Sequence, residues 1–464
     1  MAYLDSAIIG IYLFMTIIIG VIAGRGVKNA RDFAVGNKDF LTVTLIMTIF
    51  ATYMDGEIIL NGATQGFKSG ISFFYANCAD FLTLFAYGYI AQRTAKYREA
   101  ISVGDIVGQM YGKNAQVLTG VFGFLISASL VAVQFKALSF VFHYFYHISP
   151  DIGVWISALI LIAYSAFGGV RAVTWTDMIQ FFILVNAVPL VTSIAVNKIG
   201  GIHELFHLIP DNKLGFLPDN KDTLYKYLVY IIASVPLCSP PMIQRMIMSK
   251  NSNQSRNAYW IAAIISIPFF FIIAIAGMAA GILNPSMDEN NAFLYLIDNF
   301  MPVGLKGFAV AGIIAIIMST ADSFMNTASI AFSHDFVKTI GGDRISSAQE
   351  FRITKLITLV VGFIGCITAM QFNNLIDMML YSYMLWGPII SVPLIAGLFG
   401  IIAPRYAFYL SMVSGVSTAI IWTVLKLDET FYVHAILPAL GANLLTFFSC
   451  IILSKFKTKP VSSD

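Results

Sequence analysis

Hydroxyl and carboxylate side chains gather inside one apolar stretch of this chain. Residues 317–323 read I-M-S-T-A-D-S and lie within an apolar run from about 303 to 332. That run is long enough to cross a bilayer, and an ionisable side chain at such depth usually faces a cavity or an ion path. Oxygen ligands suit hard cations. Residues 317–323 therefore predict a cation site inside a membrane helix, as in a cation-coupled transporter.

The composition supports a membrane protein with a single domain spanning residues 1–464. Hydrophobic residues make up 58% of the chain and charged residues 11%, with a mean hydropathy of +0.78, whereas soluble chains carry about a quarter charged residues. The net charge of +3 is too small to indicate nucleic-acid binding, and no polar stretch is long enough for a soluble domain. The four cysteines lie in apolar segments and predict no disulfide framework.

The apolar runs predict an all-α polytopic protein with about 13 transmembrane helices. We place these helices at residues 5–24, 41–66, 71–92, 115–145, 152–168, 172–197, 223–248, 258–283, 303–336, 353–370, 374–400, 405–425 and 432–454.

Basic residues concentrate in alternate connections between these helices. They recur at residues 25–38, 93–113, 245–256, 338–355 and 455–459, whereas the other connections hold fewer bases and most of the loop acids. Because basic loops stay on the cytoplasmic side, we expect the N-terminus outside, the C-terminus inside and an odd number of helices. Bases follow the first apolar run instead of preceding it, which is the reverse of a signal peptide, so we expect a retained first helix.

Two of the predicted helices look interrupted near their middle. The second contains Thr52–Glu57, which reads T-Y-M-D-G-E, and the seventh contains Ser234, Pro236 and Pro240. Proline removes a helix hydrogen bond and glycine loosens the backbone, and freed carbonyls at membrane depth persist only where they are buried or face a cavity. In secondary transporters a pair of such breaks marks the binding site of an inverted repeat. The alternative is two packing kinks.

Four segments resemble the sodium/solute symporter family. Residues 168–180 (GGVRAVTWTDMIQ) are similar to its GG-x-x-x-V-x-W-T-D-x-x-Q signature, residues 31–36 to its D-[FY]-x-x-G loop, residues 241–245 to its P-x-x-x-QR segment, and residues 318–323 to its M-S-T-A-D-S run. The resemblance implies a LeuT-type core of five-plus-five inverted helices at about residues 41–400, with one extra helix before it and two after it.

The resemblance also implies cation ligands. One Na⁺ is expected between the first and eighth core helices, and its ligands would be the carbonyls of Ala51, Met54 and Ile316 and the hydroxyls of Ser319 and Thr320.

Some members of the family bind a second cation nearby, and the matching residues here are Asp177, Asp322 and Ser323. Since some members have serine where this chain has Asp322, three alternatives stay open for that carboxyl group. It strengthens the second cation site, carries a proton, or braces Asp177.

Two acids in the first interrupted helix, Asp55 and Glu57, depart from many relatives, which have small or hydroxyl residues there. A buried acid needs a partner. Lys136, inside the fourth predicted helix, is one candidate, and a cationic substrate is the other. The expected substrate-contacting side chains are these three and the aromatic residues Tyr53, Tyr75, Tyr381, Tyr383 and Trp386.

A zinc motif is present by spacing alone. Residues 203–207 match H-E-x-x-H, which on a helix can bind zinc in a metalloprotease. The segment lies in a polar loop of the outer face, Pro210 follows it closely, and no third ligand is evident. We therefore interpret it as a chance match and expect no enzyme activity.

The sequence thus predicts a Na⁺-coupled symporter that imports a small organic solute by alternating access across the inner (plasma) membrane. The two acids favour an amine-bearing solute. A proton-coupled symporter using Asp177 and Asp322 is one alternative, and a nutrient sensor on the same scaffold that moves no solute is another. Expected partners are the solute and the lipid bilayer, with no nucleic acid and no obligate protein partner.

Overall fold

The computed structural model describes residues 1–457 except 216, 218–220, 222–223, 226, 229–230, 232–237 and 372–374. All regular secondary structure in this part is helical, with no strand. The predicted all-α fold class is therefore confirmed.

The long helices follow the predicted apolar runs closely. Within the described residues, eight helices are long and apolar enough to cross a membrane, or nine if the bent pair α3–α4 forms one span. The count of 13 stays a prediction. The described helices of 20 or more residues, of which α5 and α17 are not among those eight, are α1 (Tyr3–Gly24), α5 (Ser72–Ala91), α7 (Lys113–Tyr146), α8 (Pro150–Ile199), α12 (Ser252–Leu283), α14 (Leu305–Ile330), α16 (Ser347–Gln371), α17 (Leu375–Leu398), α18 (Arg405–Val424) and α20 (Ile436–Lys457).

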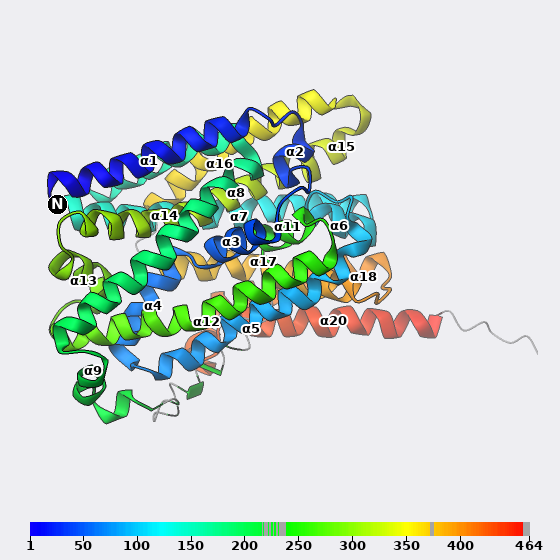
Figure 1. The fold of residues 1–464 in the computed structure, drawn as a ribbon. Helices are drawn as coiled ribbons and strands as arrows, with labels where there is room; N and C mark the ends of the chain where they lie inside the picture. Colours follow the sequence, from blue (N-terminus) through cyan, green and yellow to red (C-terminus); the bar gives the residue numbers. More distant parts are fainter. Residues whose placement is uncertain are drawn as a thin grey trace, which may run out of the picture.

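Most long helices run side by side and define two ends of one bundle (Figure 1). The N-terminus, α9 (Ile202–Leu208) and α13 (Ala292–Phe300) lie at one end, whereas α2 (Ala30–Val35), α6 (Val103–Tyr111), α15 (Thr339–Gly341) and the end of α20 lie at the other. We call the second end the basic end, because the base-rich connections around α2, α6 and α15 lie there. The N-terminus and the end of α20 at Lys457 lie at opposite ends of the bundle.

The predicted interruption of the second helix is present. Helix α3 (Thr42–Tyr53) ends at Met54, and α4 (Gly56–Ser69) begins after a 58° bend. The Asp55 side chain starts α4 by accepting a hydrogen bond from the Ile58 amide at 2.8 Å. A Cβ on Gly56 would lie 2.3 Å from Ile317 Cγ1, so only glycine lets the break pack this closely against α14.

A second break divides α8. Gly169 has φ 51°, and a Cβ there would lie 2.7 Å from Phe33 Cδ2, so the chain kinks close to the predicted boundary between residues 168 and 172. The predicted break in the seventh helix falls partly outside the described residues, which exclude Ser234 and Pro236. What is described of it, α11 (Pro240–Met248), starts with proline in its first turn, where the missing N–H costs nothing.

Helix α14 lies at the centre of the bundle. Every residue from Ala309 to Ile330 is buried, and the helix packs against α1, α3, α7, α8 and α16. It continues into a π-helix, η4 (Ala331–Lys338). The polar side chains of α14 therefore find their hydrogen-bond partners inside the protein, either on the backbone of α14 or on neighbouring helices.

Candidate functional site

Backbone and side-chain oxygens converge where α3 ends against α14. Ser319 Oγ lies 2.7 Å from the carbonyl oxygens of both Ala51 and Ile316. Thr320 Oγ1 lies 3.3 Å from the carbonyl oxygen of Thr52 and 3.5 Å from that of Ile316. The last carbonyls of a helix lack partners within it, so ending α3 here exposes Ala51 and Thr52 to α14.

Four of the five predicted Na⁺ ligands, Ala51, Ile316, Ser319 and Thr320, thus come together. Met54 is buried where the backbone leaves helical geometry, with φ −78° and ψ 84°. Within the described residues its carbonyl oxygen accepts no hydrogen bond from either hydroxyl; the threonine hydroxyl contacts the Thr52 carbonyl instead.

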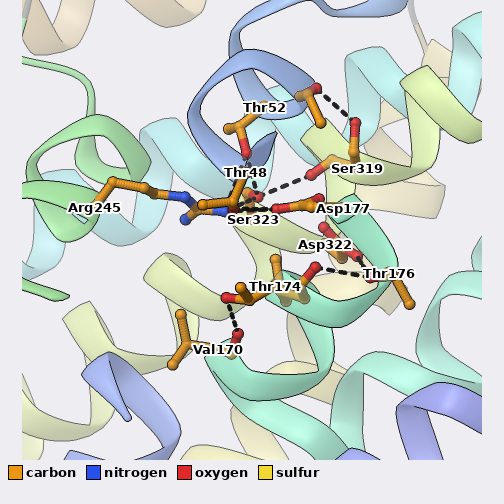
Figure 2. A network of polar contacts seen from close by, with 12 residues as sticks. Thr48, Thr52, Val170, Thr174, Thr176, Asp177, Arg245, Ser319, Asp322 and Ser323 are labelled. Atoms are coloured by element: carbon orange, nitrogen blue, oxygen red, sulfur yellow. Dashed lines mark hydrogen bonds and ion pairs between the residues drawn. The ribbon is translucent and has the colours of Figure 1, made fainter. Parts of the chain in front are cut away.

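A buried arginine of α11 binds the adjacent side of this oxygen cluster (Figure 2). Arg245 Nη2 donates to Ser323 Oγ at 2.6 Å and to Thr52 Oγ1 at 3.0 Å, and lies 3.3 Å from Asp177 Oδ2. Its side chain has no solvent exposure, and neither has that of Asp177. The Arg245 guanidinium therefore joins α3, α8, α11 and α14. The sequence analysis did not predict this linking role, although Gln244-Arg245 is part of the segment that resembles the family.

The two aspartates of this network are incompletely satisfied. Thr48 Oγ1 donates to Asp177 Oδ2, and Tyr164 OH donates to Asp322 Oδ2 at 2.8 Å. The other oxygen of each carboxyl group, Oδ1, is buried and has no hydrogen-bond partner among the described residues. The structure therefore brings Asp177, Asp322 and Ser323 into one region (Figure 2), where the Arg245 guanidinium contacts Asp177 and Ser323.

The acids of the first interrupted helix have a different environment. Asp55 caps α4, and Glu57 Oε1 accepts a hydrogen bond from Asn61 Nδ2 at 2.9 Å. Among the described residues neither acid forms an ion pair. Lys136 is 6% exposed, but its ammonium group lies over the Phe140 ring, 5.7 Å from the centroid. The lysine therefore does not neutralise either acid.

The expected aromatic contacts are spread over several helices. Tyr53 OH donates to the Asp80 carbonyl oxygen at 2.9 Å, joining the end of α3 to α5. Tyr75 is half-buried on α5 and Tyr383 half-buried on α17. Trp386 Nε1 donates to the Cys238 carbonyl oxygen at 3.1 Å, and the residue lines a pocket together with Ser102 and Gly104 at the start of α6. The side chain of Tyr381 lies outside the described part of the chain.

The H-E-x-x-H segment forms α9, with His203, Glu204 and His207 all exposed. In the described part of the chain, the group of His, Asp and Glu side chains close enough to share a metal ion is Asp105, His334 and Asp335. It includes no residue of α9.

Comparison with known proteins gives a consistent result. The model of the sodium:solute symporter family matches residues 33–453. The osmoregulated proline transporter OpuE of Bacillus subtilis is 21% identical over 98% of this chain and 95% of its own length. The sodium/sialic acid symporter NanT of Aliivibrio fischeri is 22% identical over 92% and 89%.

Solved structures agree on the fold. A Na⁺-coupled sialic acid symporter, in a substrate-bound outward-open state, matches with a TM-score of 0.83 at 18% identity over 100% of both chains. MhsT in complex with L-phenylalanine matches with a TM-score of 0.56 at 16% identity, over 88% of this chain and 98% of that one. These likenesses identify a LeuT-type fold.

Proposed function

This chain belongs to the sodium:solute symporter family, and from that premise we propose that it uses the Na⁺ gradient to import an amine-bearing organic solute across the plasma membrane. Family membership makes it a membrane transporter and not an enzyme. The single observation that carries the proposed mechanism is the convergence of carbonyl and hydroxyl oxygens between α3 and α14.

The proposed Na⁺ ligands are the carbonyls of Ala51, Met54 and Ile316 and the hydroxyls of Ser319 and Thr320. All five are neutral oxygens, which suits a monovalent cation because no fixed anion is left behind when the ion leaves. They come from the broken helix α3 and the central helix α14, so a bound ion would hold these two helices together. Na⁺ shifts the equilibrium between outward-open and inward-open forms only by its difference in affinity for the two.

A second coupling ion is proposed at Asp177, Asp322 and Ser323. The unpartnered Oδ1 atoms of both aspartates support it, because a buried carboxylate oxygen without a donor is costly. Arg245 compensates one of the two acids, so a Na⁺ ion or a proton would compensate the other. Proton coupling at this place is the second candidate mechanism.

The amine specificity rests on Asp55 and Glu57. Neither acid has an ion-pair partner among the described residues, and Lys136 lies over a phenylalanine ring instead. An ammonium group of the solute would supply the missing positive charge. Tyr53, Tyr75, Tyr381 and Trp386 are proposed as the surrounding aromatic contacts.

We place the basic end in the cytoplasm, with the N-terminus outside and the C-terminus inside, because basic connections stay on the cytoplasmic side. The N-terminus and the end of α20 lie at opposite ends of the bundle, which supports this orientation (Figure 1). Residues 1–464 would form one transporter domain with an inverted-repeat core at about residues 41–400, embedded in lipid and without an obligate protein partner.

The ion assignment is tested by thermal stability of the purified chain in Na⁺ against K⁺ at equal ionic strength. A ligand that binds only the folded state stabilises it by about 2.7 kcal/mol at 100 times its Kd. We expect a Na⁺-specific rise in Tm that Thr320→Ala abolishes. Thr174→Ala is the matched control, because among the described residues that buried threonine hydroxyl bonds only to the Val170 carbonyl in its own helix. Equal stability in Na⁺ and K⁺ would reject the ion assignment.

Transport itself is tested in proteoliposomes with labelled proline and choline. A symporter accumulates one of these amines when the Na⁺ gradient is imposed. Accumulation that follows the proton gradient alone would identify the proton-coupled alternative, and binding without accumulation would identify a sensor.

A further inference from the structure

Large apolar side chains are exposed in the connection between α17 and α18. Ile402 is 92% exposed, and Phe399 and Ile401 are exposed as well. This connection lies at the basic end, because Gly397 of α17 packs against Met110 of α6. Exposure of large apolar groups to water is unfavourable, and a cluster of them on a surface usually marks a contact with lipid or with another molecule.

An arginine lies on an aromatic ring of this connection. Arg93 follows the end of α5, and its Cζ lies 5.3 Å from the centroid of the Phe399 ring and 5.9 Å from that of the Tyr89 ring. The two rings are 5.6 Å apart. Among the described residues the Arg93 guanidinium has no ion pair and no hydrogen-bond acceptor. The rings position the cation, while its N–H donors stay available for an acidic oxygen.

Further bases border the same connection. Arg405 begins α18 and Lys113 begins α7, and both are exposed. A Cβ on Gly112 would lie 3.6 Å from Arg405 Cζ, so the arginine lies against the start of α7. Neither base has an ion-pair partner among the described residues.

The segments that meet here contain no acid of their own. Asp and Glu are absent from residues 81–98, 106–118 and 396–410. The next acid along the chain from Arg93 is Glu99, which pairs with Arg31 at 2.7 Å. The exposed apolar residues therefore lie among positive charges without a local counter-charge, a setting that attracts an anion.

Exposed apolar faces of two long helices lead to this place. On α5, Leu82 and Tyr89 are both exposed and stand seven residues apart, so they share one face, and Arg93 follows Tyr89 by four residues. On α18, exposed apolar residues recur at helical spacing after Arg405, at Tyr406, Leu410 and Val413. In a membrane protein such faces contact acyl chains, so both arginines lie where the acyl-facing surface meets the basic end.

We propose that residues 399–402, together with Arg93 and Arg405, bind an anionic phospholipid of the leaflet at the basic end. This inference goes beyond the proposed function and does not depend on the ion or the solute. A guanidinium binds phosphate oxygens through charge-assisted hydrogen bonds, and basic groups beside a membrane attract anionic headgroups. A free phosphate would leave the exposed apolar residues uncovered, whereas a phospholipid covers them and supplies the negative charge.

The test is a titration of the purified full chain in detergent with phosphatidylglycerol, in which native mass spectrometry counts the bound lipid. Phosphatidylcholine with the same acyl chains is the reference, because its headgroup carries no net charge. We expect phosphatidylglycerol to bind more tightly. Arg93→Gln should raise its Kd about tenfold, since a hydrogen bond to a charged group contributes at least that factor.

Two further variants separate a built site from the general attraction of the basic end. Arg256→Gln is the matched control, because that guanidinium also lies over a ring, 5.1 Å from the Trp260 centroid, but donates to Asn257 Oδ1 at 3.0 and 2.9 Å. It should keep the wild-type Kd for phosphatidylglycerol. Phe399→Leu removes a ring beneath Arg93 and leaves every charge in place, so it should weaken binding several-fold through lost positioning alone.

Equal binding of the two lipids to the wild type would overturn the inference, and so would an unchanged Kd in Arg93→Gln or in Phe399→Leu. An equal loss in Arg256→Gln and Arg93→Gln would show diffuse attraction and no site. Displacement of phosphatidylglycerol by glycerol 3-phosphate would show a site for a free phosphate ester and would also overturn it. If Arg93→Gln does not fold, Phe399→Leu against Arg256→Gln carries the test. None of these results involves Na⁺, so the ion assignment stands or fails separately.

Discussion

Two acidic regions of this transporter differ in how their charges are compensated: the buried one around Arg245 and the half-buried one at the start of α4. In the first, a fully buried guanidinium contacts Asp177, Thr52 and Ser323 and belongs to the folded chain itself. In the second, Asp55 and Glu57 have backbone and amide partners but no described counter-charge. Charge that the protein compensates by itself stabilises the fold, whereas charge left uncompensated is available for a ligand.

Breaking the arginine network should have the largest effect. We expect Arg245→Met to lower the free energy of unfolding by about 3–5 kcal/mol, because Asp177 would remain as a buried charge without its partner. Thermal unfolding in detergent measures this loss. The double variant Arg245→Met with Asp177→Asn should recover part of it, and a single variant as stable as wild type would show that the pair contributes nothing.

Neutralising Asp55 or Glu57 should leave the stability of the fold almost unchanged and weaken solute uptake, in contrast to the loss of Arg245. In Asp55→Asn and Glu57→Gln we expect the free energy of unfolding to stay within about 1 kcal/mol of wild type or to rise, because a desolvated charge is removed and the amides keep the acceptor oxygens. Uptake affinity for the amine solute should fall. Unchanged affinity in both variants would remove these acids from the solute site.

Asp5 is a buried acid whose charge compensation is intermediate between that of Asp177, which has an arginine partner, and that of Asp55 and Glu57, which have none among the described residues. Asp5 Oδ1 accepts from the amides of Gly304 at 2.8 Å and Gly307 at 2.9 Å, joining α1 to the start of α14. Its compensation comes from backbone dipoles. Asp5→Ala should cost about 1–2 kcal/mol of unfolding free energy, as for loss of a helix cap. Asp5→Asn, which retains an acceptor oxygen, should lose less in the same unfolding measurement.

The smallest effect concerns Asp105, which lies on the short helix α6, outside the membrane-spanning helices. Burial opposes its ionisation, but the hydrogen bond and charge of His334 outweigh burial and hold its pKa below the usual range. A lowered pKa in the folded state stabilises the fold above the unfolded value of about 3.9 and loses that contribution as the pH falls through the folded pKa. The Tm difference between wild type and Asp105→Asn should therefore be constant from pH 7 to 5 and shrink below about pH 4. A difference that stays constant to pH 3 would contradict this assignment.

Some of these features were predictable because they are local. The break in the second helix follows from Met54-Asp55-Gly56, where a glycine and a capping carboxylate stand together in an apolar run. The hydroxyl pair Ser319 and Thr320 was also visible in a motif within a single helix, and its role as ion ligands stays a prediction. Both features depend on residues that are adjacent in the chain, so they can be recognised from the sequence alone.

Other features were not predictable because their partners are remote in sequence. Lys136 was a plausible partner for Asp55 or Glu57 by depth alone, but its ammonium group lies over a ring four residues along its own helix. The role of Arg245 was missed because its contacts come from residues on three other helices.

The sequence by itself determined that this chain is helical, crosses a membrane and carries a family-type cation motif, because a bilayer admits few polar groups and requires each helix to satisfy its own backbone. Only the tertiary structure decided which acids are compensated and which are not. The reason is that the cost of a buried charge depends on the groups within a few ångströms of it. For Asp322 one such group is the hydroxyl of Tyr164, which is 158 positions away in the chain. No pattern along the sequence shows that these two side chains meet.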